Sequence, residues 1–119
     1  MSDELRGLKQ RTKGFALRII RMYCALPKST EAQVLGKQIL RSGTSVGAHY
    51  REATRARSDA EFISKLEGGL QELEETGYWL ELLGESGIVE PEKLTGLNQE
   101  TGELNAMLTA SVKTVKSRK

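Results

Sequence analysis

The chain has few of the residues that build disulfides or metal centres. Among its 119 residues are one cysteine, Cys24, one histidine, His49, and two prolines. A single cysteine excludes an internal disulfide, and we expect Cys24 to be a small interior residue in a reducing compartment. One histidine is too few for a di-iron bundle, which uses two Glu-x-x-His motifs. We therefore expect no metal and no other cofactor.

Long apolar runs are also absent, since no stretch approaches the roughly 20 residues that cross a bilayer. The first ten residues, MSDELRGLKQ, carry acids and no apolar core of a signal peptide. The 38% hydrophobic and 29% charged fractions are typical of a soluble globular protein. The sequence therefore predicts a cytoplasmic protein that does not enter a membrane, folded as one domain over residues 1–119.

The net charge of +2 is small but unevenly distributed. Residues 1–57 contain twelve Lys and Arg and four Asp and Glu, which gives +8. Residues 58–112 contain two Lys and Arg and twelve Asp and Glu, which gives −10, and the tail from Lys113 adds +4. This asymmetry indicates an anionic partner for the first half, or pairing between the halves within or between subunits. Ordinary solvated helix faces are the remaining explanation.

Apolar residues recur at steps of three and four in four segments, which predicts four amphipathic helices. The predicted helices cover about residues 3–26, 30–57, 58–86 and 91–117, with Pro27 between the first two segments and Pro91 at the start of the fourth. We expect capping boxes at Thr30 with Gln33 and at Ser58 with Glu61. Because every connection is short, neighbouring helices should be antiparallel. The sequence therefore predicts an all-α, up-down-up-down antiparallel four-helix bundle.

The second predicted helix is rich in small residues. Each glycine in a helix interior lowers helix stability by roughly 1 kcal/mol relative to alanine. We expect this helix to be approached closely by a neighbour. If the chain folds back at residue 57, His49 lies near Leu66 and Gly69, and we interpret it as a buried polar residue. The apolar stripe of the second predicted helix contains Leu35, Ile39, Ser42, Val46, His49, Ala53 and Ala56. The small residues of this helix are Ser42, Gly43, Ser45, Gly47 and Ala48.

A basic stripe follows the same helix, offset by two residues, or about 200°, from the apolar one. It contains Lys37, Arg41, Arg51 and Arg55, with Arg57 at the following corner, and Arg11 and Arg18 extend it from the first helix. Cations on one face can follow a phosphate backbone by charge without reading bases. Tyr50 is the one aromatic residue interleaved with them, so base stacking has little support. These cations are the predicted nucleic-acid-binding residues, for RNA or DNA.

The third predicted helix carries an acidic ridge of Glu67, Glu74 and Glu81 at seven-residue spacing. In a self-associating bundle, this ridge could face the basic stripe of a neighbour. Apolar residues outside the core stripes, such as Leu17 and Ile20, would supply the adhesion. A structural adaptor, whose charges serve assembly or a protein partner, is therefore the alternative function.

Four blocks of sequence carry a family resemblance: LKQRTKGFALRII, LPKSTEAQVLGKQILRSGTSVGAHYREA, RARSDAEFISKL and YWLELL. They resemble the small bacterial four-helix-bundle proteins encoded by intervening sequences within 23S ribosomal RNA genes. That family is similar in turn to the accessory variability determinant of diversity-generating retroelements. The resemblance implies a homo-oligomer, expected as a homopentamer, with a basic surface that binds nucleic acid and a reverse transcriptase as a possible partner.

Catalytic motifs find little support in the residues. Helical-bundle ribonucleases of the HEPN class place Arg and His on one helix at a shorter interval than the eight positions between Arg41 and His49. His49 lies on the apolar stripe and Arg41 does not. A serine nucleophile such as Ser42 or Ser45 would need a base, and the single histidine is poorly placed for it. The sequence therefore predicts a protein that is not an enzyme.

Overall fold

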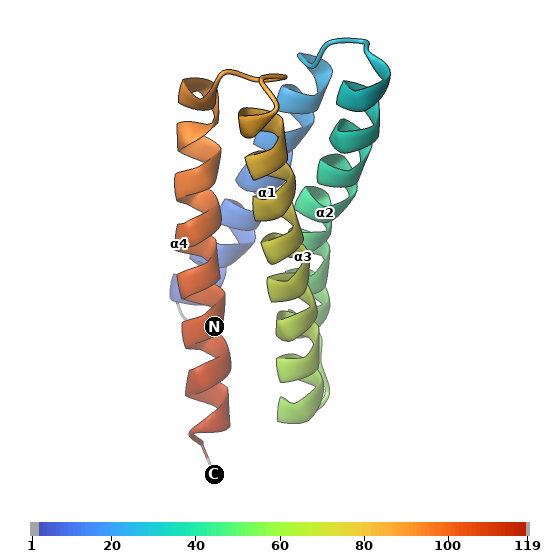
Figure 1. Cartoon of the computed structure of the whole chain (residues 1–119). Helices are drawn as coiled ribbons and strands as arrows, with labels where there is room; N and C mark the ends of the chain where they lie inside the picture. Colours follow the sequence, from blue (N-terminus) through green and yellow to red (C-terminus); the bar gives the residue numbers. More distant parts are fainter. Residues whose placement is uncertain (1–2, 119) are drawn as a thin grey trace.

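The computed structural model describes the backbone of residues 3–118 and the side chains of residues 7–118. Its described chain forms four long helices and no strand (Figure 1). These are α1 (Asp3–Cys24), α2 (Thr30–Thr54), α3 (Asp59–Glu85) and α4 (Pro91–Lys116). The predicted all-α, up-down-up-down bundle is confirmed. Residues 1, 2 and 119 of the predicted domain lie outside the described residues.

The start of α2 differs from the predicted capping box. Ser29 is the N-cap, and its side-chain oxygen accepts a hydrogen bond from the backbone N–H of Ala32 at 3.3 Å. Thr30 is already helical. The Gln33 side-chain amide donates instead to the Pro27 carbonyl at 2.8 Å, which fastens the turn between α1 and α2. The prediction was therefore one residue too late, because Ser29 and Thr30 are both good caps by composition.

The other helix starts follow the predicted chemistry. Ser58 caps α3 by accepting a hydrogen bond from the backbone N–H of Glu61 at 3.0 Å. Pro91 lies in the first turn of α4, where its missing N–H costs no helical hydrogen bond. Gly87, in the turn between α3 and α4, adopts a φ of 81°, a conformation that side chains disfavour.

The four helices form a closed square in chain order. Each of the seams α1/α2, α2/α3, α3/α4 and α1/α4 is in contact, whereas α1 and α3 lie on one diagonal of the square and α2 and α4 on the other. We use "seam" for the interface between two neighbouring helices. The bundle measures 50 × 21 × 19 Å. Because α2 and α4 run in the same direction, both helices finish at the same end of the molecule (Figure 1).

The core is a continuous column of aliphatic side chains with two aromatic ones. Cys24 is not part of it, since its side chain is exposed. The prediction of an interior cysteine was wrong because Leu26, two residues later, is the buried residue at this end of the first helix. The completely or almost completely buried members include Leu8, Phe15, Ile19, Ile39, Val46, Tyr50, Leu66, Leu73, Leu80, Leu83, Leu94, Leu104 and Leu108.

The small residues of α2 admit α1 closely, as expected from the sequence. A Cβ atom at Gly43 would lie 2.8 Å from Cγ1 of the buried Ile19, and one at Gly36 would lie 2.6 Å from Cδ1 of Leu26. Both separations are too short for real carbon atoms. These glycines therefore set the distance between α1 and α2, and the packing compensates for their low helix propensity.

The buried face of α2 is broader than the single predicted stripe, because it packs against both α1 and α3. Tyr50, which the sequence placed among the outer cations, is 1% exposed and belongs to the core. The side chain of His49, which the sequence placed in the core, is 30% exposed and lies at the edge of α3. Both assignments were wrong because α2 contacts two neighbours at once, so one stripe at heptad-like spacing describes only part of its buried surface.

Candidate nucleic-acid interface

The predicted cations of α2 fall into two groups in the structure. Lys37, Arg51 and Arg55 are exposed on the outer face of the helix, and Arg57 is exposed in the turn that follows. None of these four has an ion-pair partner among the described residues. Lys37 and Arg55 are eighteen positions apart, which corresponds to about 27 Å along the helix. The first group therefore offers uncompensated positive charge along one side of the bundle.

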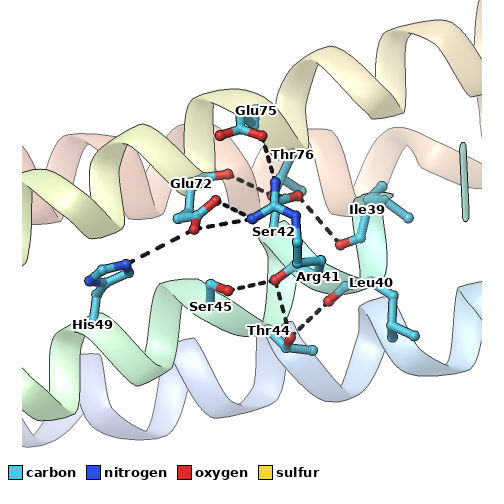
Figure 2. A network of polar contacts seen from close by, with 10 residues as sticks. All are labelled: Ile39, Leu40, Arg41, Ser42, Thr44, Ser45, His49, Glu72, Glu75 and Thr76. Carbon is cyan, nitrogen blue, oxygen red and sulfur yellow. Dashed lines mark hydrogen bonds and ion pairs between the residues drawn. The ribbon is translucent and has the colours of Figure 1, made fainter. Parts of the chain in front are cut away.

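Arg41 forms the second group because it is held by two carboxylates of α3 (Figure 2). Its Nη1 lies 3.1 Å from Oε1 of Glu72, and its Nη2 lies 2.7 Å from Oε1 of Glu75. The hydrogen bond and charge of Glu72, followed by those of Glu75, hold the pKa of Arg41 above its ordinary range. The guanidinium is half exposed, yet its charge is compensated locally. Its predicted role in nucleic-acid binding stays a prediction.

His49 reaches the same carboxylate from one side. Its Nε2 lies 4.0 Å from Oε2 of Glu72, and its Nδ1 lies 3.8 Å from Oε1 of Glu52. The ring rests over Gly68, where a Cβ atom would come within 2.9 Å of the imidazole Cε1. Gly69, near which the sequence placed this histidine, also lies beside it, since a Cβ atom there would be 3.4 Å from the His49 Cβ. Arg41 and His49, expected on different faces, are thus joined through Glu72 (Figure 2).

Hydroxyl groups close the interior of this α2/α3 seam. The Ser42 and Thr76 hydroxyls are 2.8 Å apart, and Thr76 also donates to the Glu72 carbonyl at 2.9 Å. Ser45 donates to the Arg41 carbonyl at 2.7 Å. Among the described contacts, neither serine is hydrogen-bonded to His49.

Arg11 lies on a different side of the molecule from the α2 cations. In the α1/α4 seam its Nη2 contacts Oε1 of Glu100 at 2.7 Å and Oε1 of Glu103 at 2.6 Å. Hydrogen bonds from Arg11 to Glu100 and then to Glu103 raise the pKa of the guanidinium. Arg18, seven residues later, is exposed over the same seam beside Gly96. The structure therefore does not bring Arg11 and Arg18 together with the basic stripe of α2.

Further cations, which the sequence prediction omitted, lie at the end of α4. Lys113 and Arg118 are exposed and have no ion-pair partner in the described chain, whereas Lys116 pairs with Glu67 at 3.3 Å. Because α2 and α4 end together, these residues share one end of the bundle with the last α2 cations (Figure 1). The antiparallel topology and the preference of cations for helix C-termini could have predicted this grouping. We call Arg51, Arg55, Arg57, Lys113 and Arg118 the basic end.

The outer faces of α1 and α3 carry apolar side chains in opposite electrostatic settings. On α1, Leu17 is 44% and Ile20 is 39% exposed, with Lys13 and Arg21 exposed on the same helix. On α3, Tyr78 is 54% exposed, and Glu74 and Glu81, which precede and follow it by one turn, are exposed as well. The two helices are diagonal in the bundle, so the basic and acidic apolar faces point in opposite directions.

No group of three or more His, Cys, Asp or Glu side chains is placed to hold a metal ion among residues 7–118, whose side chains the structure describes. Within the same residues, no helix is both long and apolar enough to span a bilayer.

Comparison with known proteins identifies the family. Residues 7–110 match the 23S rRNA-intervening sequence protein family. The chain belongs to this family. The match covers all of α2 and α3, most of α1 and α4, and therefore every predicted cation of the interface.

A solved structure related to this intervening-sequence protein supports the fold. It is a crystal structure from Bacteroides thetaiotaomicron, described as a protein of unknown function from the S23 ribosomal protein family. The two sequences are 41% identical over 92% of this chain and 98% of the other, and the TM-score is 0.87. No curated protein matches the chain.

Proposed function

We propose that this chain is a non-catalytic accessory protein that binds RNA or DNA and acts as a homo-oligomer. The observation that carries the proposal is the set of exposed cations without acid partners, which follows the outer face of α2 and widens at the basic end. Such charge favours contact with phosphates, which positions a nucleic acid without reading its sequence. The burial of Tyr50 removes the aromatic residue that could have stacked on bases.

The proposal includes two further features that rest on the family resemblance. The oligomer is expected to be a ring, with five copies as the first expectation. A reverse transcriptase is a candidate protein partner in addition to the nucleic acid. Neither feature is needed for the binding experiment, which tests the cations alone.

The binding experiment compares charge-matched variants across a salt series. A labelled single-stranded RNA and a DNA duplex are titrated with wild type, and the logarithm of affinity is plotted against the logarithm of salt concentration. Each phosphate contact contributes about −0.7 to the slope for single strands and about −0.9 for duplex DNA. We expect R51Q/R55Q to make the slope shallower by about 1.4 for the single strand and about 1.8 for the duplex, and to weaken binding to every sequence about equally.

The matched control is R11Q/R41Q, which removes the same charge from arginines already paired with carboxylates. It should leave the slope close to that of wild type. Equal changes in slope for the two double variants would contradict the proposal, because binding would then follow net charge rather than the uncompensated cations. Salt-independent binding by wild type would contradict it as well.

A second candidate function is supported by the outer faces of α1 and α3. The exposed Leu17 and Ile20 lie among cations, whereas the exposed Tyr78 lies among carboxylates, and the faces point away from each other. An unlike-face contact between copies could bury the apolar side chains at its centre and pair the charges at its rim. Repeated contacts of this type generate rings or filaments. On this hypothesis the chain is chiefly a structural adaptor.

Mixing two blocked variants tests the adaptor hypothesis. L17E/I20E blocks the α1 face, and Y78K blocks the α3 face. Each variant alone should sediment as a monomer, and an equimolar mixture should form a dimer and nothing larger, because one intact unlike-face contact remains. Oligomers that persist in either single variant would exclude this interface. A mixture that stays monomeric while both variants remain helical would exclude it too.

A further inference from the structure

A cavity of about 660 Å³ opens at the end of the bundle opposite the basic end. Its lining residues come from the end of α1, the turn before α2, the turn between α3 and α4, and the start of α4. These segments all lie at the same end of the bundle (Figure 1). Its volume lies within the range of about 300 to 1,000 Å³ that small-molecule sites occupy. The lining residues used below are Arg18, Arg21, Leu26, Ile88, Glu90, Lys93 and Leu97.

The inner part of the cavity is apolar. Leu26 and Leu97 are each 5% exposed, and Ile88 packs partly buried against the same core. Leu26 comes from the turn after α1, Ile88 from the turn after α3, and Leu97 from α4. These side chains give the cavity a floor that can receive an apolar group without unsatisfied polar atoms.

The lining also contains three cations and one carboxylate. Arg18, Arg21 and Lys93 have no ion-pair partner among the described residues, and neither has Glu90. Three positive charges and one negative charge leave a net charge of +2 around the opening. A phosphate monoester carries about −1.5 to −2 at pH 7, whereas a carboxylate carries −1. The local charge therefore favours a phosphate monoester over a carboxylate.

Arg18 is positioned at the wall of this cavity by Gly96 of α4. A Cβ atom at residue 96 would collide with Nη2 of Arg18, so glycine allows the guanidinium to lie against the helix. A glycine in a helix interior lowers helix propensity. The contrast with Arg11, seven residues earlier on the same seam, is direct: Arg11 binds Glu100 and Glu103, whereas Arg18 lies beside a glycine. The α1/α4 seam thus compensates one arginine and leaves the next available.

We propose that this cavity binds a nucleotide-sized phosphate monoester. Arg18, Arg21 and Lys93 surround the phosphate, since guanidinium groups match phosphate oxygens with paired hydrogen bonds. The organic part lies on Leu26, Ile88 and Leu97. The same chemistry is presented by a free nucleotide and by the phosphorylated 5′ end of a nucleic-acid strand. The site does not depend on the proposed function, because it lies at the opposite end of the bundle from Arg51 and Arg55.

Calorimetric titration with defined probes tests the site. The probes are adenosine 5′-monophosphate, phenyl phosphate, adenosine and inorganic phosphate at constant ionic strength. We expect both monoesters to bind, and adenosine and inorganic phosphate each to bind at least about tenfold more weakly, since each lacks one half of the recognised chemistry. Failure of both monoesters to bind, or equal affinities for adenosine and its monophosphate, would overturn the proposal.

Variants place the binding in the cavity. R18Q and R21Q should each weaken the binding of adenosine 5′-monophosphate by about tenfold, the effect of one lost charge-assisted contact. E90Q should strengthen it, because a repelling carboxylate is removed. R51Q/R55Q should leave it unchanged, which separates this site from the proposed nucleic-acid interface. Binding that survives R18Q/R21Q undiminished overturns the assignment.

G96A tests the positioning of Arg18 with the arginine still present. Added bulk at residue 96 should move the guanidinium and weaken monoester binding while the circular dichroism spectrum stays helical. Inorganic phosphate contacts only the cations, so if G96A also weakens the binding of inorganic phosphate, the arginine has been displaced. If only monoester binding weakens, the apolar floor has changed instead. Unchanged affinity in a folded G96A protein would refute the positioning role.

The two sources of the ligand are separated by RNA strands that differ only at the 5′ end. If a 5′-phosphorylated strand binds more tightly than its 5′-hydroxyl counterpart, and R18Q abolishes the difference, the natural ligand is a strand end. If the two strands bind equally while the mononucleotide binds in the cavity, the ligand is a free nucleotide. Both results support the cavity as a monoester site. The outcome that would overturn the site is the failure of both monoesters to bind in the calorimetric titration.

Discussion

The α2/α3 and α1/α4 seams join their long helices in different ways. The α2/α3 seam is filled along its length by Arg41 with its two glutamates, by the paired hydroxyls of Ser42 and Thr76, and by His49 over a glycine. The α1/α4 seam is closed by Arg11 at one end and opens into the cavity at the other. Ion pairs and hydrogen bonds close the α2/α3 seam, whereas the α1/α4 seam leaves Arg18 without an ion-pair partner among the described residues.

The largest difference between the seams should appear when matched leucines are truncated. Leu73 of α3 is fully buried, whereas Leu97 of α4 borders the cavity. We expect L73A to lower the free energy of unfolding by about 3 to 5 kcal/mol, because it creates a closed void. L97A should cost closer to about 2 kcal/mol, since it enlarges a space already open to water. Urea denaturation measures both; equal losses would mean that the cavity is not open.

The hydroxyl pair offers the next largest test of the closed seam. T76V leaves Ser42 with only its 3.5 Å hydrogen bond to the Ile39 carbonyl and should cost about 1 kcal/mol, the net contribution of one lost hydrogen bond. S42A/T76V should cost less than the sum of the two single variants, with a coupling above about 0.5 kcal/mol. A double-mutant cycle in urea measures this coupling. Strict additivity would show that the two hydroxyls do not interact.

Glycine-to-alanine substitutions should change the stability of the two seams by smaller amounts. Each substitution gains up to about 1 kcal/mol of helix propensity. In G68A this gain should be cancelled or reversed, because the new Cβ meets the His49 ring between its two carboxylates. In G96A most of the gain should remain, since Arg18 can swing into solvent. Thermal unfolding should therefore rank G96A above G68A, and the reverse order would contradict the comparison.

The smallest expected effect is an acid dependence of the α1/α4 seam. A hydrogen bond from Gln99, and then one from Arg11, lowers the pKa of Glu103 from its ordinary value of 4.5. A carboxylate with a lowered folded-state pKa stabilises the fold above its unfolded value and loses that contribution as pH falls through the folded one. Stability should therefore decline below about pH 4.5, and less so in E103Q. E74Q, at a carboxylate without an ion pair in the described chain, is the control; identical profiles for both variants would refute the assignment.

The fold was largely predictable because its signals are local. Apolar periodicity, two prolines and short connections determine four antiparallel helices, and Ser58 was recognisable as a cap. The site was less predictable because it depends on neighbours. Helical spacing placed Arg41 on an outer face but could not indicate that Glu72 and Glu75 reach it from α3. Likewise, the seven-residue spacing of Arg11 and Arg18 suggested equivalent roles, and only the α4 residues opposite them distinguish a paired arginine from an available one.

Lys37, Arg51, Arg55 and Arg57 stay predictions as nucleic-acid contacts, although their exposure suits the role. The basic end contains cations that a prediction from α2 alone omits. Lys113 and Arg118 are far from Arg51 in the sequence, and the antiparallel topology brings them to the same end of the molecule. Charge grouped by topology, rather than charge counted along one helix, is therefore the better guide to an electrostatic surface.

The two seams also differ in when they can form. Arg41 and Glu72 are 31 residues apart in the chain, whereas Arg11 and Glu100 are 89 apart. During synthesis, the first three helices can associate before α4 has been made, because contacts of short sequence separation form with the least loss of chain entropy. Until α4 arrives, the nascent protein exposes the core sides of α1 and α3, which makes this interval its period of greatest risk for aggregation.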